Sequence, residues 1–92
     1  MKINTKQVLQ DLSGENLKDN GKELTMGIAL SRILSYSKTD NQVMSWYLAK
    51  EIYKNEEVKL KAEEIIHLRN IINTTEVYAP IVTGQLLELI KE

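Results

Sequence analysis

From residue 25 onward, apolar side chains recur every three or four positions, the spacing that places them on one face of an α-helix. This pattern commits most of the chain to helices separated by short polar segments. Four helices are predicted: about 26–37, about 41–54, from 61 or 62 to about 74, and from 80 to 89 or 90.

The predicted helix ends carry residues suited to those positions. Thr25 can cap the first helix and Asp40 the second, because their side-chain oxygens can accept from free backbone N–H groups. Glu63 and Glu64 fall in the first turn of the third helix, where the helix dipole favours carboxylates. Pro80 suits the first turn of the fourth helix, where a missing N–H costs nothing.

Turn-forming residues are concentrated before residue 24, in the segments 13–16 and 19–22. They bracket short apolar stretches, and the sequence therefore predicts a small β-hairpin over residues 6–19 with a four-residue loop. A disordered arm that becomes ordered on binding is the alternative. The contacts of the hairpin with the rest of the domain are expected from Val8, Leu12 and Leu17.

The predicted fold class is α+β, mainly α: an N-terminal β-hairpin followed by a compact four-helix bundle over residues 25–92, in a single domain of residues 1–92. Alternation over 58–60 indicates one further short strand. A chain of 92 residues, 42% apolar, can bury one core without metal or disulfides. The core predicted from the first, third and fourth helices contains Ile33, Leu34, Ile65, Leu68, Ile72, Leu86 and Ile90.

Composition excludes several classes of function. The chain has no Cys, which removes thiol catalysis, Cys-based zinc sites and disulfides. Twelve Lys and Arg against 13 Asp and Glu give a net charge of −1, whereas nucleic-acid binders of this size usually carry a basic excess. No apolar run is long enough to cross a bilayer, and residues 1–6 lack the apolar stretch of a signal peptide. We therefore expect a cytoplasmic protein without membrane association.

Few side chains are suited to catalysis. His67 is the single histidine, and helical spacing places it with Glu63 and Glu64 on the polar face of the third helix, which predicts a solvated position. The chain has no phosphate-binding glycine motif, no nucleophile motif and no second His or Cys to complete a metal site. The sequence therefore predicts a protein that is not an enzyme, with no catalytic residues, no metal site and no cofactor.

Two glycines lie inside predicted helices. Relative to Ala, a glycine at Gly27 or Gly84 lowers the stability of its helix by roughly 1 kcal/mol, so each position needs an explanation. The usual one is close approach of another backbone. Packing within the core of this chain is one source of that approach, and a partner pressing on the same point is the other.

The predicted helix over 41–54 is apolar on more than one side. Met44, Leu48 and Ile52 form one continuous stripe at helical spacing. Trp46 and Tyr53 lie on another side of the helix, together with Lys50. A helix of this kind is either central in its domain or buries one face against something else.

Trp and Tyr are enriched in interface hot spots because they combine a large rigid contact area with a polar tip. Two interpretations are open. In one, the aromatics complete the core and the hairpin covers Trp46. In the other, Trp46, Tyr53 and Lys50 are partner-binding residues. Lysines interleaved with these aromatics could also bind single-stranded nucleic acid, but neighbouring glutamates make the net charge of this segment slightly negative.

Several short segments together resemble a family of small proteins encoded by bacteriophages and prophages, over nearly the full length of the chain. The segments are VLQDLSG with LKD (8–14 and 17–19), ELTMG (23–27), LAKEIY (48–53) and YAPIVTGQLLEL (78–89). Lys61 departs from the pattern, which has an acidic cap there. These are packing and turn motifs, so the resemblance implies a fold and a phage setting, and it carries over no catalytic residues.

The resemblance implies a small phage-encoded protein that binds a host protein in a defence or nucleic-acid-processing complex and inhibits it. A structural or assembly role in the virion, as a connector or chaperone component, is the alternative. A homodimer is compatible with either role. A nucleic-acid-binding regulator comes third, because the charge balance disfavours it.

Overall fold

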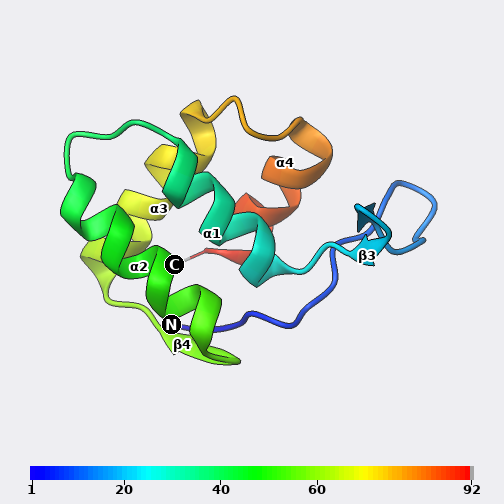
Figure 1. Ribbon diagram of the computed structural model, residues 1–92, viewed down its shortest axis with the longest axis horizontal. Coiled ribbons are helices and arrows are strands. Elements are labelled where there is room, and N and C mark those ends of the chain that lie inside the picture. Colours follow the sequence, from blue (N-terminus) through cyan, green and yellow to red (C-terminus); the bar gives the residue numbers. More distant parts are fainter. Residues whose placement is uncertain (92) are drawn as a thin grey trace.

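A computed structural model, which describes residues 1–91, has four helices and two small antiparallel sheets (Figure 1). The fold is a compact α+β arrangement, mainly α. Its helices are α1 (Met26–Tyr36), α2 (Gln42–Lys54), α3 (Ala62–Thr74) and α4 (Pro80–Leu89). Its strands are β1 (Lys2–Asn4), β2 (Lys18–Asp19), β3 (Lys22–Glu23) and β4 (Glu57–Lys59).

The four predicted helices are confirmed, with one cap corrected. The Thr25 hydroxyl accepts from the backbone N–H of Ile28, as predicted, and Pro80 is the first residue of α4. The cap of α2 is Asn41 rather than Asp40: its side-chain oxygen lies 3.0 Å from the backbone nitrogen of Met44. The two residues are adjacent and equally suited to the role, so the sequence could not separate them.

All seven predicted core residues are buried, and they belong to a single cluster that also takes in residues from the loops and β-strands. α1 packs against both α2 and α3, and α3 against α4. The buried residues outside the predicted set include Ile3, Leu9, Leu24, Leu48, Ile52, Val58, Leu60 and Ile71.

Strand β1 pairs with β4, with Ile3 opposite Val58. The short strand predicted over 58–60 is present at Glu57–Lys59, but its partner was not predicted. The pairing joins segments more than 50 positions apart, and no local pattern shows which distant segment a strand will meet. This sheet holds the start of the chain next to β4, near the C-terminal end of α2 (Figure 1).

The predicted hairpin over 6–19 is misplaced. The paired strands are β2 and β3, joined by a two-residue turn at Asn20 and Gly21, both with positive φ (52° and 79°). An Asn-Gly pair adopts this turn at little cost, and its twist suits antiparallel strands. Between two residues of the segment 6–19 there is one isolated bridge, from Gln10 to Asn16, while β2 at its end pairs outside it and Val8 forms a bridge with Thr25.

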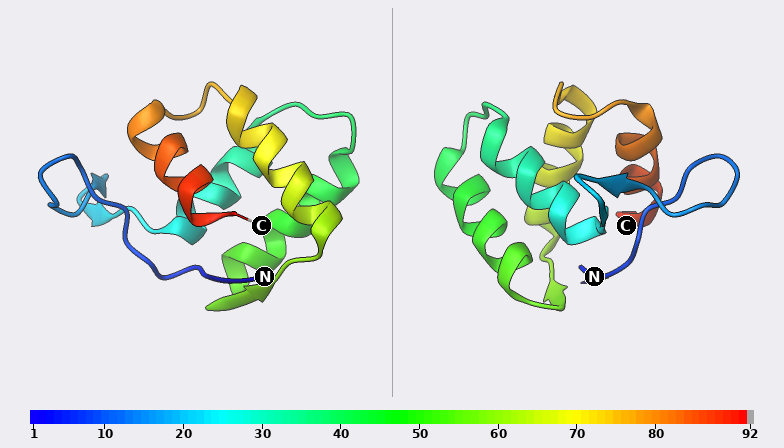
Figure 2. Two further views of the ribbon diagram at one scale, coloured as in Figure 1. Left: turned by 180° about the vertical axis from the view of Figure 1, so that it is seen from behind. Right: turned by 45° about the vertical axis from the view of Figure 1, so that its right-hand side comes forward.

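The expected hairpin contacts are only partly realised. Leu12 lies fully exposed at the tip of a loop, whereas Leu9, which was not predicted, is buried. The loop is held by the Asp11 carboxylate, which accepts from the backbone N–H groups of Ser13 and Glu15. Leu17 packs partly buried against the core. The loop projects from the end of the molecule opposite α2 (Figures 1 and 2).

The two helical glycines have different explanations. A Cβ on Gly27 would lie 2.8 Å from Thr5 Cβ and 2.9 Å from Thr5 O, so here another backbone of the same chain does approach. A Cβ on Gly84 would meet nothing within 4 Å. Close packing therefore explains Gly27 and does not explain Gly84.

Candidate functional site

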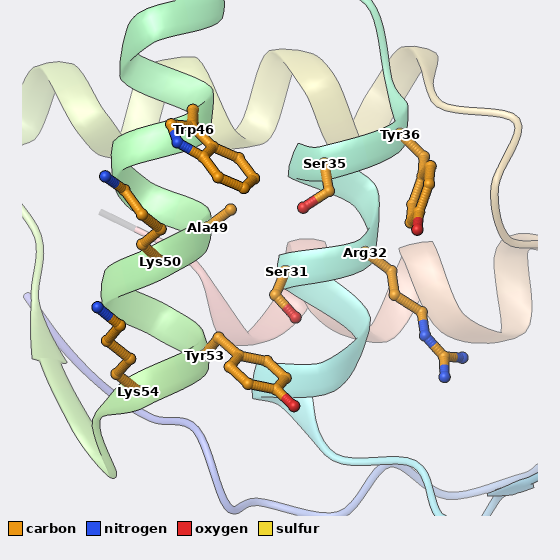
Figure 3. A pocket seen from close by; sticks show the side chains of 9 residues that line it. All are labelled: Ser31, Arg32, Ser35, Tyr36, Trp46, Ala49, Lys50, Tyr53 and Lys54. Atoms are coloured by element: carbon orange, nitrogen blue, oxygen red, sulfur yellow. The ribbon is translucent and has the colours of Figure 1, made fainter.

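A groove runs along the surface between α1 and α2, which lie side by side (Figure 3). Its floor is made of small side chains, Ser31 and Ser35 from α1 and Ala49 from α2. Ser31 and Ala49 are buried, because the two helices meet there. Small residues at this contact leave a furrow of about 470 Å³ above it.

Aromatic side chains form the walls of the groove. The rings of Trp46 and Tyr53 extend from α2 towards α1, and Tyr36 stands at the far edge of α1 (Figure 3). Trp46 is 58% exposed, Tyr53 75% and Tyr36 79%. Large aromatic surface is therefore open to solvent around a floor of small side chains.

The edges of the groove are basic. Lys50 and Lys54 follow the outer edge of α2, one turn apart, and Arg32 stands on the outer edge of α1 (Figure 3). The Lys50 ammonium lies 5.7 Å from the centre of the Trp46 ring, within the range of a cation–π interaction.

A second hollow of about 490 Å³ continues the groove past Trp46 towards the loop between the helices. It shares Ser35, Tyr36 and Trp46 with the first and adds Lys38. None of the residues lining either hollow is Asp or Glu. We call the two hollows together the α1–α2 groove.

Arg32 has a second role at the edge of this groove. Its guanidinium forms a salt bridge with Asp19 of β2 and lies 3.2 Å from the Tyr78 hydroxyl. Within residues 1–91, Lys38, Lys50 and Lys54 form no salt bridge. A ligand could therefore pair with these three lysines without first displacing a carboxylate of the described residues.

The three predicted partner-binding residues, Trp46, Lys50 and Tyr53, lie together in the α1–α2 groove. Of the predicted stripe, Leu48 and Ile52 are buried in the core, and Met44 packs against it partly buried. Trp46 does not belong to the core, and the N-terminal hairpin does not cover it, because the hairpin lies at the other end of the molecule. What these residues bind stays a prediction.

Sequence reasoning missed the α1 side of the groove. Helical spacing places Ser31 and Ser35 opposite the apolar stripe of their helix, and this position gives no sign that a second helix packs beside them. Tyr36 and Lys38 come at the end of α1 and in the loop after it. Only the packing of α1 on α2 brings these four residues to Trp46.

His67 is not on a fully solvated face as predicted. Its Nε2 lies 2.8 Å from the hydroxyl oxygen of Ser45, a residue only 3% exposed on α2. Burial lowers the pKa of His67 below its ordinary value. The contact between the two side chains links α2 to α3.

Two further findings bear on function. Within residues 1–91, no three His, Cys, Asp or Glu side chains are grouped so as to hold a metal ion. In the same part of the chain, no helix has the length and apolar character needed to span a membrane.

No protein family model matches the chain, and comparison with curated proteins and with solved structures finds no match either. What the α1–α2 groove binds therefore has to be inferred from its own residues.

Proposed function

We propose that the chain is a non-catalytic binding protein that contacts a host protein through the α1–α2 groove and inhibits or modulates it. The observation that carries this proposal is the exposure of Trp46, Tyr53 and Tyr36 around one apolar furrow. Aromatic side chains at the centre of an interface commonly supply 2 kcal/mol or more of binding free energy.

The setting in which we place this activity is phage infection, and it rests on the sequence resemblance. A defence or nucleic-acid-processing complex of the host is the proposed target. The protein would act in the host cytoplasm and without a cofactor, since inhibition by occupying a surface needs neither catalysis nor a bound group.

The test is affinity capture from host lysate with three baits: the wild-type chain, a groove variant and a matched control. The groove variant carries Trp46→Ala and Tyr53→Ala. The control carries Val43→Ala and Tyr47→Ala, two exposed side chains on another side of the same helix that do not line the α1–α2 groove. A partner identified this way is then purified, and its activity is measured with and without each bait.

The proposal expects one host protein to be held by the wild type and the control and lost by the groove variant. The activity of that protein should fall when the wild-type chain is added. A partner held equally by all three folded baits would place the contact elsewhere, and capture without any effect on activity would remove the inhibitory role.

A virion assembly role is the second proposal, supported by Val43 and Tyr47, which are 81% and 52% exposed. Copies of the chain could meet through this side of α2 while the groove takes another protein. Light scattering separates the two proposals. Ring-sized oligomers that dissociate when Val43→Ala and Tyr47→Ala are introduced would favour assembly, whereas a monomer at all concentrations would oppose it.

A further inference from the structure

We infer that the occupant of the α1–α2 groove is an acidic amphipathic helix of the partner protein. This inference rests on the proposed function, because it takes the groove as the binding surface, and it adds the chemistry and secondary structure of what binds. Charge, the spacing of the lysines and the shape of the groove floor support it independently.

Charge is segregated at this surface. The whole chain carries slightly more acidic than basic residues, with a net charge of −1. Yet the α1–α2 groove is lined by Arg32, Lys38, Lys50 and Lys54 and by no acidic residue. Like charges gathered along a groove of a nearly neutral protein favour a ligand of opposite charge and repel basic ones.

The spacing of the basic residues fits a helical ligand. Lys50 and Lys54 lie one turn apart on α2, roughly 6 Å along the axis. Carboxylates four residues apart on a partner helix have the same spacing and could face both ammonium groups at once. Across the furrow the Arg32 guanidinium is already paired with Asp19, so the third lysine of the groove, Lys38 in the second hollow, is the cation left for a further carboxylate of the same helix.

The floor fits the apolar face of such a helix. Ser31, Ser35 and Ala49 leave space between the rings of Trp46 and Tyr53, and side chains one turn apart on a partner helix would enter that space. This is the helix-in-groove mode of recognition, in which apolar anchors set the position and flanking charges set the specificity.

Single-stranded nucleic acid is also anionic and stacks on aromatic rings, but the observations favour it less. The Lys50 ammonium lies over the Trp46 ring and occupies one of the faces on which a base would stack. The net charge of −1 also weakens the counterion release on which most of that affinity depends.

The experiment is a selection from a displayed library of helix-forming peptides of about five turns, with apolar anchors held constant and flanking positions randomised. Three baits are used. They are the wild type, a groove variant with Lys50→Glu and Lys54→Glu, and a control with Lys18→Glu and Lys22→Glu. The control changes the charge equally at exposed lysines that line neither hollow.

We expect acidic flanks to be enriched by the wild type and by the control, and basic flanks by the groove variant. Individual acidic peptides, measured by fluorescence anisotropy, should bind the groove variant at least about tenfold more weakly than the wild type. Selected peptides without acidic flanks, or no selected peptides at all, would overturn the inference.

A labelled oligodeoxythymidine of about 15 nucleotides is measured with the same three baits. If it binds the wild type more tightly than the selected peptides and loses affinity with the groove variant, the ligand is nucleic acid and the inference is wrong. The peptides could fail to bind although the Trp46→Ala and Tyr53→Ala variant no longer captures the host partner. That result would overturn the acidic helix and leave the proposed function standing. The proposed function fails separately, if that pair of substitutions leaves capture unchanged.

Discussion

Gly27 and Thr5 are in direct backbone contact: the N–H of Gly27 donates to the carbonyl oxygen of Thr5, with N and O 2.8 Å apart. The Thr5 hydroxyl in turn donates to the carbonyl oxygen of Asn55, 2.5 Å away, at the end of α2. The segment after β1 is thus held between the start of one helix and the end of another. This contact is why α1 has a glycine in its first turn.

Opposite effects are expected from the same substitution at the two helical glycines. Gly27→Ala should lower the free energy of unfolding, because the new Cβ would overlap Thr5 and neither backbone can move without losing hydrogen bonds. Gly84→Ala should raise it by roughly 1 kcal/mol, because nothing lies within 4 Å and Ala favours helix. Urea unfolding of both variants checks this, and the same sign at both positions would contradict it.

A charge placed in the core should unfold the domain. Leu86 is completely buried, and Leu86→Asp would leave a carboxylate without a partner, a cost of several kcal/mol. Leu12→Asp makes the same chemical change at a fully exposed position and should alter the free energy of unfolding by less than about 0.5 kcal/mol. Circular dichroism during thermal unfolding distinguishes the two, and a wild-type melting temperature for Leu86→Asp would refute the core assignment.

His67 should make stability depend on pH in a narrow window. In the unfolded chain its pKa is about 6.5, and burial lowers the pKa in the folded state. As pH falls from 6.5 towards the folded pKa, the unfolded state therefore takes up the proton first, and the free energy of unfolding decreases. Above pH 6.5 this contribution to stability is complete.

Denaturant unfolding at several pH values tests this expectation, with His67→Gln as the variant. The dependence between the folded pKa and 6.5 should be lost in His67→Gln. It should persist in Glu56→Gln, because the Lys6 ammonium holds the pKa of the Glu56 carboxyl below its ordinary value and thus outside this window. An unchanged slope in His67→Gln would assign the dependence to another group.

Arg69 should stabilise the end of α4. Its guanidinium donates to the carbonyl oxygen of Leu87, 2.8 Å away, and to that of Ile90. Carbonyl groups at the C-terminal end of a helix have no N–H partner within the helix. Arg69→Ala should cost about 1–3 kcal/mol, since these are hydrogen bonds from a charged donor. Arg69→Lys keeps the charge and should recover part of the loss. Amide hydrogen exchange at the end of α4 should be fastest in Arg69→Ala, slower in Arg69→Lys and slowest in the wild type. Unaltered exchange in Arg69→Ala would contradict the stabilising role of Arg69.

Trp46 should report its exposed position through fluorescence. It is the single tryptophan, so its emission should be red-shifted and readily quenched by acrylamide in the free protein. Trp46→Ala should keep the melting temperature close to that of the wild type, because little buried surface is lost. Blue-shifted emission together with early melting of the variant would place Trp46 in the core. Addition of a groove ligand should shift the emission to the blue and reduce quenching.

The sequence by itself determined the four helices and the centre of the core. The stripes that contain Ile33, Leu68 and Leu86 are local patterns of period 3.6, and burying them requires no knowledge of which element each will meet. The same holds for the turn at Asn20 and Gly21, whose backbone preference depends on the two residues themselves. The sequence also marked the side of α2 with Trp46 as apolar, but it left two positions open for that side, in the core or on the surface.

Tertiary structure alone decided everything that depends on two segments far apart in the chain. β1 pairs with β4 because of a register that no short-range pattern encodes, and Gly27 is needed because Thr5 arrives beside it. His67 is not fully solvated because Ser45 of another helix lies within hydrogen-bond distance of its ring. The α1–α2 groove likewise exists only where two helices meet, so its floor and its second basic edge appear once packing has placed Ser31 and Arg32 opposite Trp46 and Lys50.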